Sequence, residues 1–137
     1  FLDTRQPLAD HVHFRGRVSR PQMEAIYNSS DFLLQGSRRE FSGFVLVEAM
    51  ACGVIPVVSD IPAFRDMTDE GRLALLFPPG NAEALASRVL AMDLAHAPAL
   101  SAAIVEHFTR HLSFAAMATQ LEGIYVDLIE KQGHHDK

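Results

Sequence analysis

Two glutamates, Glu40 and Glu48, are the residues whose surroundings point most clearly to chemistry in this chain. Glu48 is the one charged residue in the apolar stretch 44–52, and a helix that is apolar all round is predicted to be buried. A buried carboxylate needs a partner because an unpaired charge costs more than one helix supplies. Glu48 is therefore expected either to bond an internal group, such as a backbone amide or Arg65, or to accept hydrogen bonds from the hydroxyls of a ligand.

The turn before this helix is predicted to favour an anion. Ser42 and Gly43 end a loop that follows a predicted buried strand. Free amides and the dipole at a helix start attract phosphate, and Gly43 permits close approach of a ligand to the backbone. Glu40 lies in the same loop, where its simplest interpretation is a solvated carboxylate paired with Arg38 or Arg39.

The remaining reactive side chains predict neither a metal site nor a nucleophile. His11 and His13 would share one face of a strand, but no third ligand lies near them in the sequence, which also has no Asp-x-Asp pair. Cys52 lies in an apolar run before a helix-ending glycine, as core cysteines do. Since it is the only cysteine, an internal disulfide and a cysteine-rich zinc module are excluded.

The elements that must position these residues alternate between strands and helices. Alternating or continuous apolar runs predict four strands, at 12–18, 31–34, 55–58 and 73–77. The run 31–34 is typical of a strand buried on both faces. Helices are predicted from a capping box at 19–22, over 43–52 with Gly53 closing it, from Asn81, over 99–111, and from Ser113.

This order predicts an α/β fold with a mainly parallel sheet that ends in helices. Ligands of such sheets bind at the carboxyl ends of the strands, so the loops after Val18, Leu34 and Val58 are the places to search. The final helix is expected to carry apolar side chains on one side, and the tail 132–137 is polar and expected to be flexible. The apolar residues of that helix are Phe114, Met117, Leu121, Ile124, Tyr125 and Leu128.

The amino-acid composition further narrows the possible classes of protein. The 137 residues suit one domain, and a net charge of −5 argues against a nucleic-acid partner. No apolar run approaches the ~18 residues of a membrane span, and the first residues do not form a signal peptide, so a cytoplasmic location is expected.

The segment 37–58 resembles the glutamate–seven residues–glutamate segment of retaining GT-B glycosyltransferases of the family 4 type. Its flanks agree: 13–18 looks like the strand before that family's base-binding loop, and 75–81 looks like its turn with Pro and Gly before a helix. Together with 108–128, which looks like its closing helices, the resemblance covers residues 10–131. It implies a Rossmann-like sheet in which 1–131 is the later part of a C-terminal nucleotide-sugar-binding domain.

The resemblance also implies a role for each matching position. Glu40 would hold sugar hydroxyls of the donor at the catalytic centre, and Glu48 would hold the ribose diol. Backbone groups would line the sugar and the pyrophosphate and face the base; these are the amides of Ser42, Gly43, Phe44 and Val45, and the backbone at Arg17 and Val18.

The implied reaction moves a hexosyl group, with retention, from a UDP- or GDP-linked sugar to a glycan, lipid or small-molecule acceptor. No cofactor and no obligatory metal are implied, and the acceptor would bind an N-terminal domain, with peripheral attachment to the inner face of the membrane left open. The alternative is a non-catalytic interaction module that keeps the same fold. A dinucleotide-dependent oxidoreductase is less favoured because no Gly-x-Gly-x-x-Gly follows a strand.

Three departures from the family pattern bear on these expectations. Phe41 stands where the family has a glycine, and Pro62-Ala63 replaces a frequent glycine pair. The family's pyrophosphate-neutralising Arg and Lys would precede residue 1, and the only lysines here are Lys131 and Lys137. We therefore expect an N-terminally incomplete domain that is inactive in isolation and self-associates through an exposed strand edge.

Overall fold

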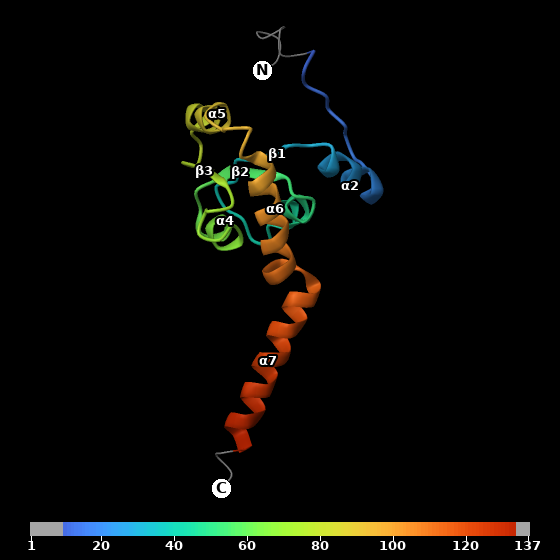
Figure 1. Ribbon diagram of the computed structural model, residues 1–137, viewed down its shortest axis with the longest axis vertical. Coiled ribbons are helices and arrows are strands. Elements are labelled where there is room, and N and C mark those ends of the chain that lie inside the picture. The colour runs from blue at the N-terminus through green and yellow to red at the C-terminus, as the bar shows by residue number, and fades with distance from the viewer. Residues whose placement is uncertain (1–9, 134–137) are drawn as a thin grey trace.

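A three-stranded parallel sheet organises the computed structural model, which describes residues 10–133, with side chains to residue 131 (Figure 1). The strands are β1 (Phe32–Gln35), β2 (Ile55–Ser59) and β3 (Leu75–Phe77), in the order β1-β2-β3. Leu34 pairs with Val57, which pairs in turn with Leu75. The predicted α/β class with a parallel sheet is confirmed.

Helices connect the strands and follow them. The helical elements are α2 (Arg20–Asn28), α3 (Phe44–Ala51), α4 (Pro62–Met67), α5 (Ala82–Leu90), α6 (Ala97–His107), the π-helical turn η1 (Phe108–Leu112) and α7 (Phe114–Gly133). The predicted helix over 99–111 thus starts two residues earlier and ends as a π-helical turn.

The core lies around β2, which is buried along its whole length. Leu46 and Met50 of α3, Phe64 of α4 and Ile104 of α6 are fully buried and form one apolar cluster with Val58 of β2. A second cluster joins α2 to α3, where Tyr27 packs with Ala49 and Val54. The sheet centre therefore fixes α3, the helix that carries Glu48, and α2 packs on the side of α3.

Local sequence signals place the helix ends correctly. Gln22 Oε1 accepts hydrogen bonds of 2.8 Å from the backbone N–H and the hydroxyl of Ser19 at the start of α2. Asn81 Oδ1 caps α5 by accepting from Ala84 N over 2.9 Å. Gly53 closes α3 with a φ of +73°, a conformation that glycine adopts without strain.

Two predictions about strands are wrong. Residues 12–18 are not a strand, and Phe14 in their middle is 84% exposed. A strand needs backbone partners, and in the described part of the chain β1 pairs only with β2, leaving this segment unpaired. Leu34 of β1 was predicted to be buried but is 55% exposed, because nothing among residues 10–133 covers that face of the edge strand.

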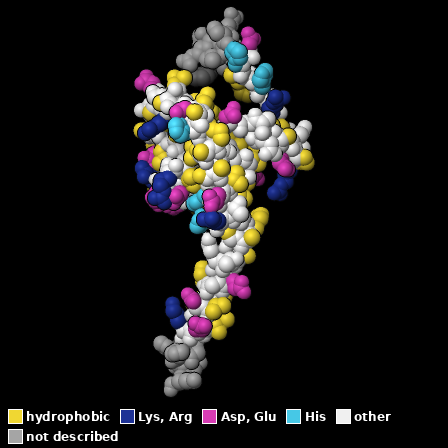
Figure 2. Space-filling model, viewed as in Figure 1, with side chains coloured by type: hydrophobic (Ala, Val, Ile, Leu, Met, Phe, Trp, Pro, Cys, Tyr) yellow, Lys and Arg dark blue, Asp and Glu magenta, His cyan; other side chains and the backbone are white. Residues whose placement is uncertain are grey.

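The last helix, α7, extends away from the sheet (Figure 1), and Figure 2 shows hydrophobic side chains along it. The six apolar residues predicted on it are all exposed, from 48% for Met117 to 87% for Phe114. Among the described residues no helix combines the length and hydropathy that a membrane span requires. The predicted tail 132–137 lies outside the described residues except for the backbone of 132–133, which continues α7.

Candidate functional site

The loop after β1 turns into α3 at Gly43, and the turn favours glycine. Gly43 is buried and has a φ of +57° in the left-handed region. A Cβ atom added there would lie 2.5 Å from both Sδ and Cε of Met67. A side chain here would strain the backbone and require the end of Met67 to move, whereas glycine leaves the backbone open to close approach.

Glu40 is held by this turn rather than by a cation. Its Oε1 accepts from Phe41 N over 3.1 Å and from Gly43 N over 3.3 Å, while its Oε2 accepts from Gln35 Nε2 over 3.1 Å. The predicted pairing with Arg38 or Arg39 is wrong: no ion pair joins them in the described chain. The loop folds back so that its own amides reach the carboxylate before either exposed arginine does.

The same bonds fix the charge of Glu40. The Gly43 amide, and then the Phe41 amide, lower the pKa of the Glu40 carboxyl, because hydrogen bonds to an ionised group favour that form. A carboxylate has about four acceptor positions, of which three are occupied here. Glu40 is therefore ionised at neutral pH and keeps room for about one hydrogen bond from a ligand.

Helix α3 is buried on one face only, so the prediction of all-round burial is wrong. Leu46, Ala49 and Met50 are fully buried, but Phe44 is 70% and Val45 is 47% exposed. The apolar pattern told which residues are hydrophobic, whereas burial depends on what packs against each side of the helix. Glu48 lies on the exposed part and needs no internal counter-charge.

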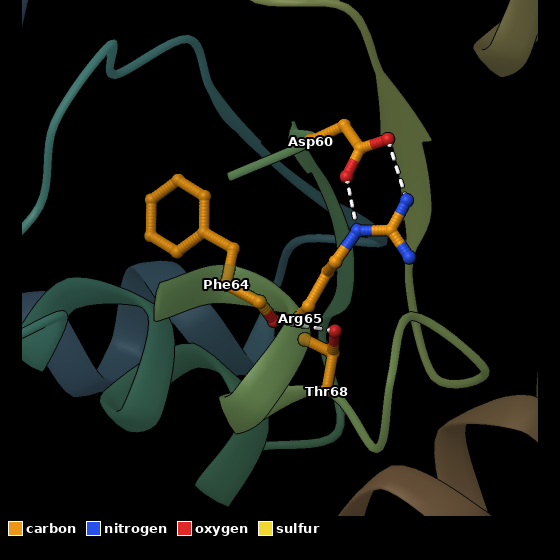
Figure 3. Close-up of polar contacts among 4 residues, drawn as sticks. All are labelled: Asp60, Phe64, Arg65 and Thr68. Atoms are coloured by element: carbon orange, nitrogen blue, oxygen red, sulfur yellow. Dashed lines mark hydrogen bonds and ion pairs between the residues drawn. The ribbon is translucent and has the colours of Figure 1, made fainter. Parts of the chain in front are cut away.

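The contacts of Glu48 also differ from the internal pairing considered for it. The Tyr27 hydroxyl donates to Glu48 Oε2 over 3.4 Å. Arg65 is engaged elsewhere: its Nη2 donates to Asp60 Oδ2 over 2.7 Å and its Nε donates to Asp60 Oδ1 (Figure 3). Burial, followed by the charge of Glu48, raises the pKa of Tyr27, so its hydroxyl stays protonated as a donor.

Tyr27 and Glu48 line a cleft between α2 and α3 of about 360 Å³. Of the two positions expected to face a base, Val18 lines this cleft and Arg17 does not. Its walls are mostly apolar, with Glu48 as an acceptor. The full lining is Val18, Ser19, Arg20, Met23, Glu24, Tyr27, Glu48, Ala51 and Cys52.

The sequence-predicted residues thus fall into two places joined by α3. Glu48 and Val18 meet in the α2–α3 cleft, while Glu40, Ser42 and Gly43 form the turn at the start of α3, next to the exposed Phe44 and Val45. Tyr27 and Gln35 were missed, because a tyrosine on the apolar side of a helix and a glutamine ending a strand look structural in sequence. What marks both residues is their hydrogen bonds to the two glutamates, and these bonds can be seen only in the three-dimensional structure.

Cys52, predicted to be a core cysteine, packs against the Tyr27 cluster but also lines the cleft. It lies half-buried at the end of α3, and burial raises the pKa of its thiol, which keeps it un-ionised at neutral pH. No group of three or more His, Cys, Asp or Glu that could hold a metal ion occurs within the described residues. The arrangement as a whole offers fixed acceptors and backbone donors.

A parallel α/β sheet with a glycine turn after its first strand and a cleft beside the helix that follows defines a Rossmann-like domain of the GT-B glycosyltransferase type. Residues 4–94 match the family model described as glycosyl transferases group 1, so the chain belongs to that family. The match spans the sheet, both glutamates and the cleft.

Curated relatives agree with this assignment. The chain is 37% identical over 86 residues to a phosphatidyl-myo-inositol mannosyltransferase of Mycobacterium leprae, covering 62% of this chain and 23% of the relative. It is 34% identical over 87 residues to a GDP-mannose:cellobiosyl-diphosphopolyprenol alpha-mannosyltransferase of Xanthomonas oryzae pv. oryzae, covering 64% and 23%. The chain therefore spans about a quarter of the length of these relatives.

Among solved structures, the chain is similar to a sucrose-phosphate synthase from Thermosynechococcus elongatus. The TM-score is 0.79 with 27% sequence identity, and the match covers 95% of this chain and 33% of that one. The expected GT-B resemblance is confirmed at the level of fold and family.

Proposed function

We propose that this chain is the donor-binding part of a glycosyltransferase that moves a hexosyl group from a UDP- or GDP-linked sugar to an acceptor, with retention. One observation carries the proposal: one acceptor carboxylate, Glu40, lies in the glycine turn before a short helix, and a second, Glu48, lies on that helix beside a cleft. Family membership and mannosyltransferase relatives support it.

The nucleoside would occupy the α2–α3 cleft. The apolar walls, among them Val18 and Met23, suit a base, and Glu48 would accept both hydroxyls of the ribose diol. The protonated Tyr27 hydroxyl beside Glu48 Oε2 leaves the other carboxylate oxygen without a described partner. A cleft of about 360 Å³ lies within the usual range for small-molecule sites.

The diphosphate and sugar would lie at the start of α3. The amides of Gly43 and Ser42 face Glu40, so those of Phe44 and Val45 are the ones best placed for the diphosphate, aided by the helix dipole, and Ser42 and Gly43 would line the sugar. The ionised Glu40 would accept a hydrogen bond from a sugar hydroxyl. Base, ribose, phosphates and sugar would then follow α3 from its end to its start.

In the proposed reaction, the bond between the anomeric carbon and the diphosphate oxygen breaks, and the acceptor oxygen bonds the same carbon from the same face. The acceptor proton leaves with the diphosphate, whose growing charge the helix-start amides stabilise. No cofactor and no metal ion is proposed. The acceptor, a glycan, a lipid or a small molecule, would bind outside residues 1–137, and the isolated chain would not transfer sugar.

Calorimetry with GDP and UDP on the whole protein tests the proposal. Glu48→Gln is expected to weaken binding of the preferred nucleotide by about 1–3 kcal/mol, the cost of losing a charge-assisted hydrogen bond. Glu83→Gln on the exposed start of α5 is the matched control and should change nothing. Unchanged affinity in the Glu48 variant rejects its role, and a protein that binds neither nucleotide supports a non-catalytic interaction module.

A further inference from the structure

The side-chain amide of Gln35 contacts Glu40 at the carboxyl end of β1. Its Nε2 donates to Glu40 Oε2 over 3.1 Å and lies 3.4 Å from Ser37 Oγ. The amides of Phe41 and Gly43 hold the other oxygen, Oε1. Each oxygen of the carboxylate therefore has its own anchor, and the Ser37 hydroxyl beside the Gln35 amide also helps to lower the pKa of the Glu40 carboxyl.

The same side-chain amide also lowers the stability of the fold, because its oxygen is buried without a hydrogen-bond partner. Gln35 Oε1 is shut off from solvent and has no hydrogen-bond partner, a condition that it shares with Ser59 Oγ in the described residues. Ser59 ends β2, next to Val58, which pairs with Gln35. An unpaired buried acceptor lowers stability, so an apolar side chain of similar length would suit β1 better.

We propose that Gln35 is a positioning residue for Glu40: it fixes Oε2 so that the carboxylate meets the donor sugar in one orientation. The proposal rests on the sugar-binding role proposed for Glu40. Two backbone bonds to Oε1 alone leave the carboxylate free to turn about its terminal bonds. A third bond to Oε2 defines the plane of the group, and with it the direction of the acceptor position that remains for a sugar hydroxyl.

The decisive variant is Gln35→Met in the whole protein, since methionine keeps the length of the side chain and removes both amide atoms. Binding of a nucleotide sugar, probed with GDP-mannose and UDP-glucose, is expected to weaken about 3- to 10-fold, the value of one hydrogen bond. Binding of GDP or UDP alone is expected to stay unchanged, because neither carries the sugar. The melting temperature is expected to stay equal or rise, because the unpaired Oε1 is gone.

Two further variants complete the test. Gln120→Met makes the same chemical change on the exposed face of α7 and should leave affinities and melting temperature unchanged. Gln35→Glu keeps the length but replaces the donor by a second acceptor, so it should weaken nucleotide-sugar binding more than Gln35→Met does. If Gln35→Met fails to fold, Gln35→Glu alone still tests the proposal.

The outcomes separate this proposal from the one on which it rests. If Glu40→Gln leaves nucleotide-sugar affinity unchanged, the sugar role of Glu40 fails and the positioning role fails with it. If Glu40→Gln weakens that affinity and the Gln35 variants do not, only the positioning role is overturned. A lower melting temperature with equal loss of nucleotide and nucleotide-sugar binding also overturns it, because Gln35 would then serve the fold.

Discussion

The β2–α4 region and helix α7 are similarly rich in apolar residues, yet those of the first are buried and those of the second are exposed. In the first, Val57, Val58 and Phe64 have no exposed surface. In the second, Phe114 is 87% and Ile129 is 70% exposed. The apolar side chains of the first region pack against α3 and α6, while the apolar side of α7 has no partner among the described residues. The comparison therefore distinguishes apolar side chains that stabilise the fold of the described residues from apolar side chains that these residues leave uncovered.

The largest expected effect compares one phenylalanine from each region. Phe64→Ala should lower the free energy of unfolding by about 3–5 kcal/mol, because it removes a fully buried ring and leaves a cavity. Phe114→Ala should change it by about 0.5 kcal/mol or less in the isolated chain. Urea denaturation of the two variants measures both, and equal losses would show that α7 is packed after all.

The second prediction concerns self-association of the isolated 137-residue chain. The apolar side chains of α7 recur at spacings of three and four residues, the pattern of a helix-pairing seam. Light scattering is expected to show a species larger than a monomer, and Leu121→Glu with Leu128→Glu should shift it toward the monomer. Thr119→Glu, off that seam, is the control. Association that survives the double change would implicate the free edge of β1 instead.

The smallest expected effect is the pH dependence of the stability that the Asp60–Arg65 pair contributes to the β2–α4 region. Arg65 lowers the pKa of the Asp60 carboxyl in the folded state, chiefly through the hydrogen bond between them. The contribution to stability is therefore complete above the ordinary Asp value and is lost as pH falls through the lowered one, between about pH 5 and about pH 2.

Asp60→Asn should remove this dependence, measured as the shift in urea midpoint across that pH range. Since the two side chains are 35% and 45% exposed, solvent screening keeps the effect small. Glu106→Gln breaks the more exposed pair between Glu106 of α6 and Arg110 of η1 and should matter less still. A larger shift from Glu106→Gln would contradict this ranking.

Elements that depend on neighbours in sequence could be predicted from the sequence. The caps at Ser19, Asn81 and Ser113 and the closing Gly53 follow from local backbone needs, and the unbroken apolar run of β2 is typical of a buried strand. The parallel sheet followed from the alternation of strands and helices, and the family from the segment around the two glutamates.

Features that depend on distant partners could not be predicted. Residues 12–18 have a strand pattern but no backbone among residues 10–133 to pair with, and α3 has an apolar surface that this part of the chain covers on one side only. The bonds of Glu40 were also misjudged, since a sequence shows two adjacent arginines but not a loop turning its amides inward. Tyr27 and Gln35 came to attention only through what they contact.

The π-helical turn η1 is the joint from which the long helix α7 extends. Ser113, extended at the joint, donates its amide to Phe108 O over 2.9 Å, and η1 lies against α3, the helix of Glu48. Twenty residues of helix extend about 30 Å from that joint, so a rotation of about 10° there moves the far end by about 5 Å. A change in the direction of α7 at this joint is therefore largest at the tip of the helix.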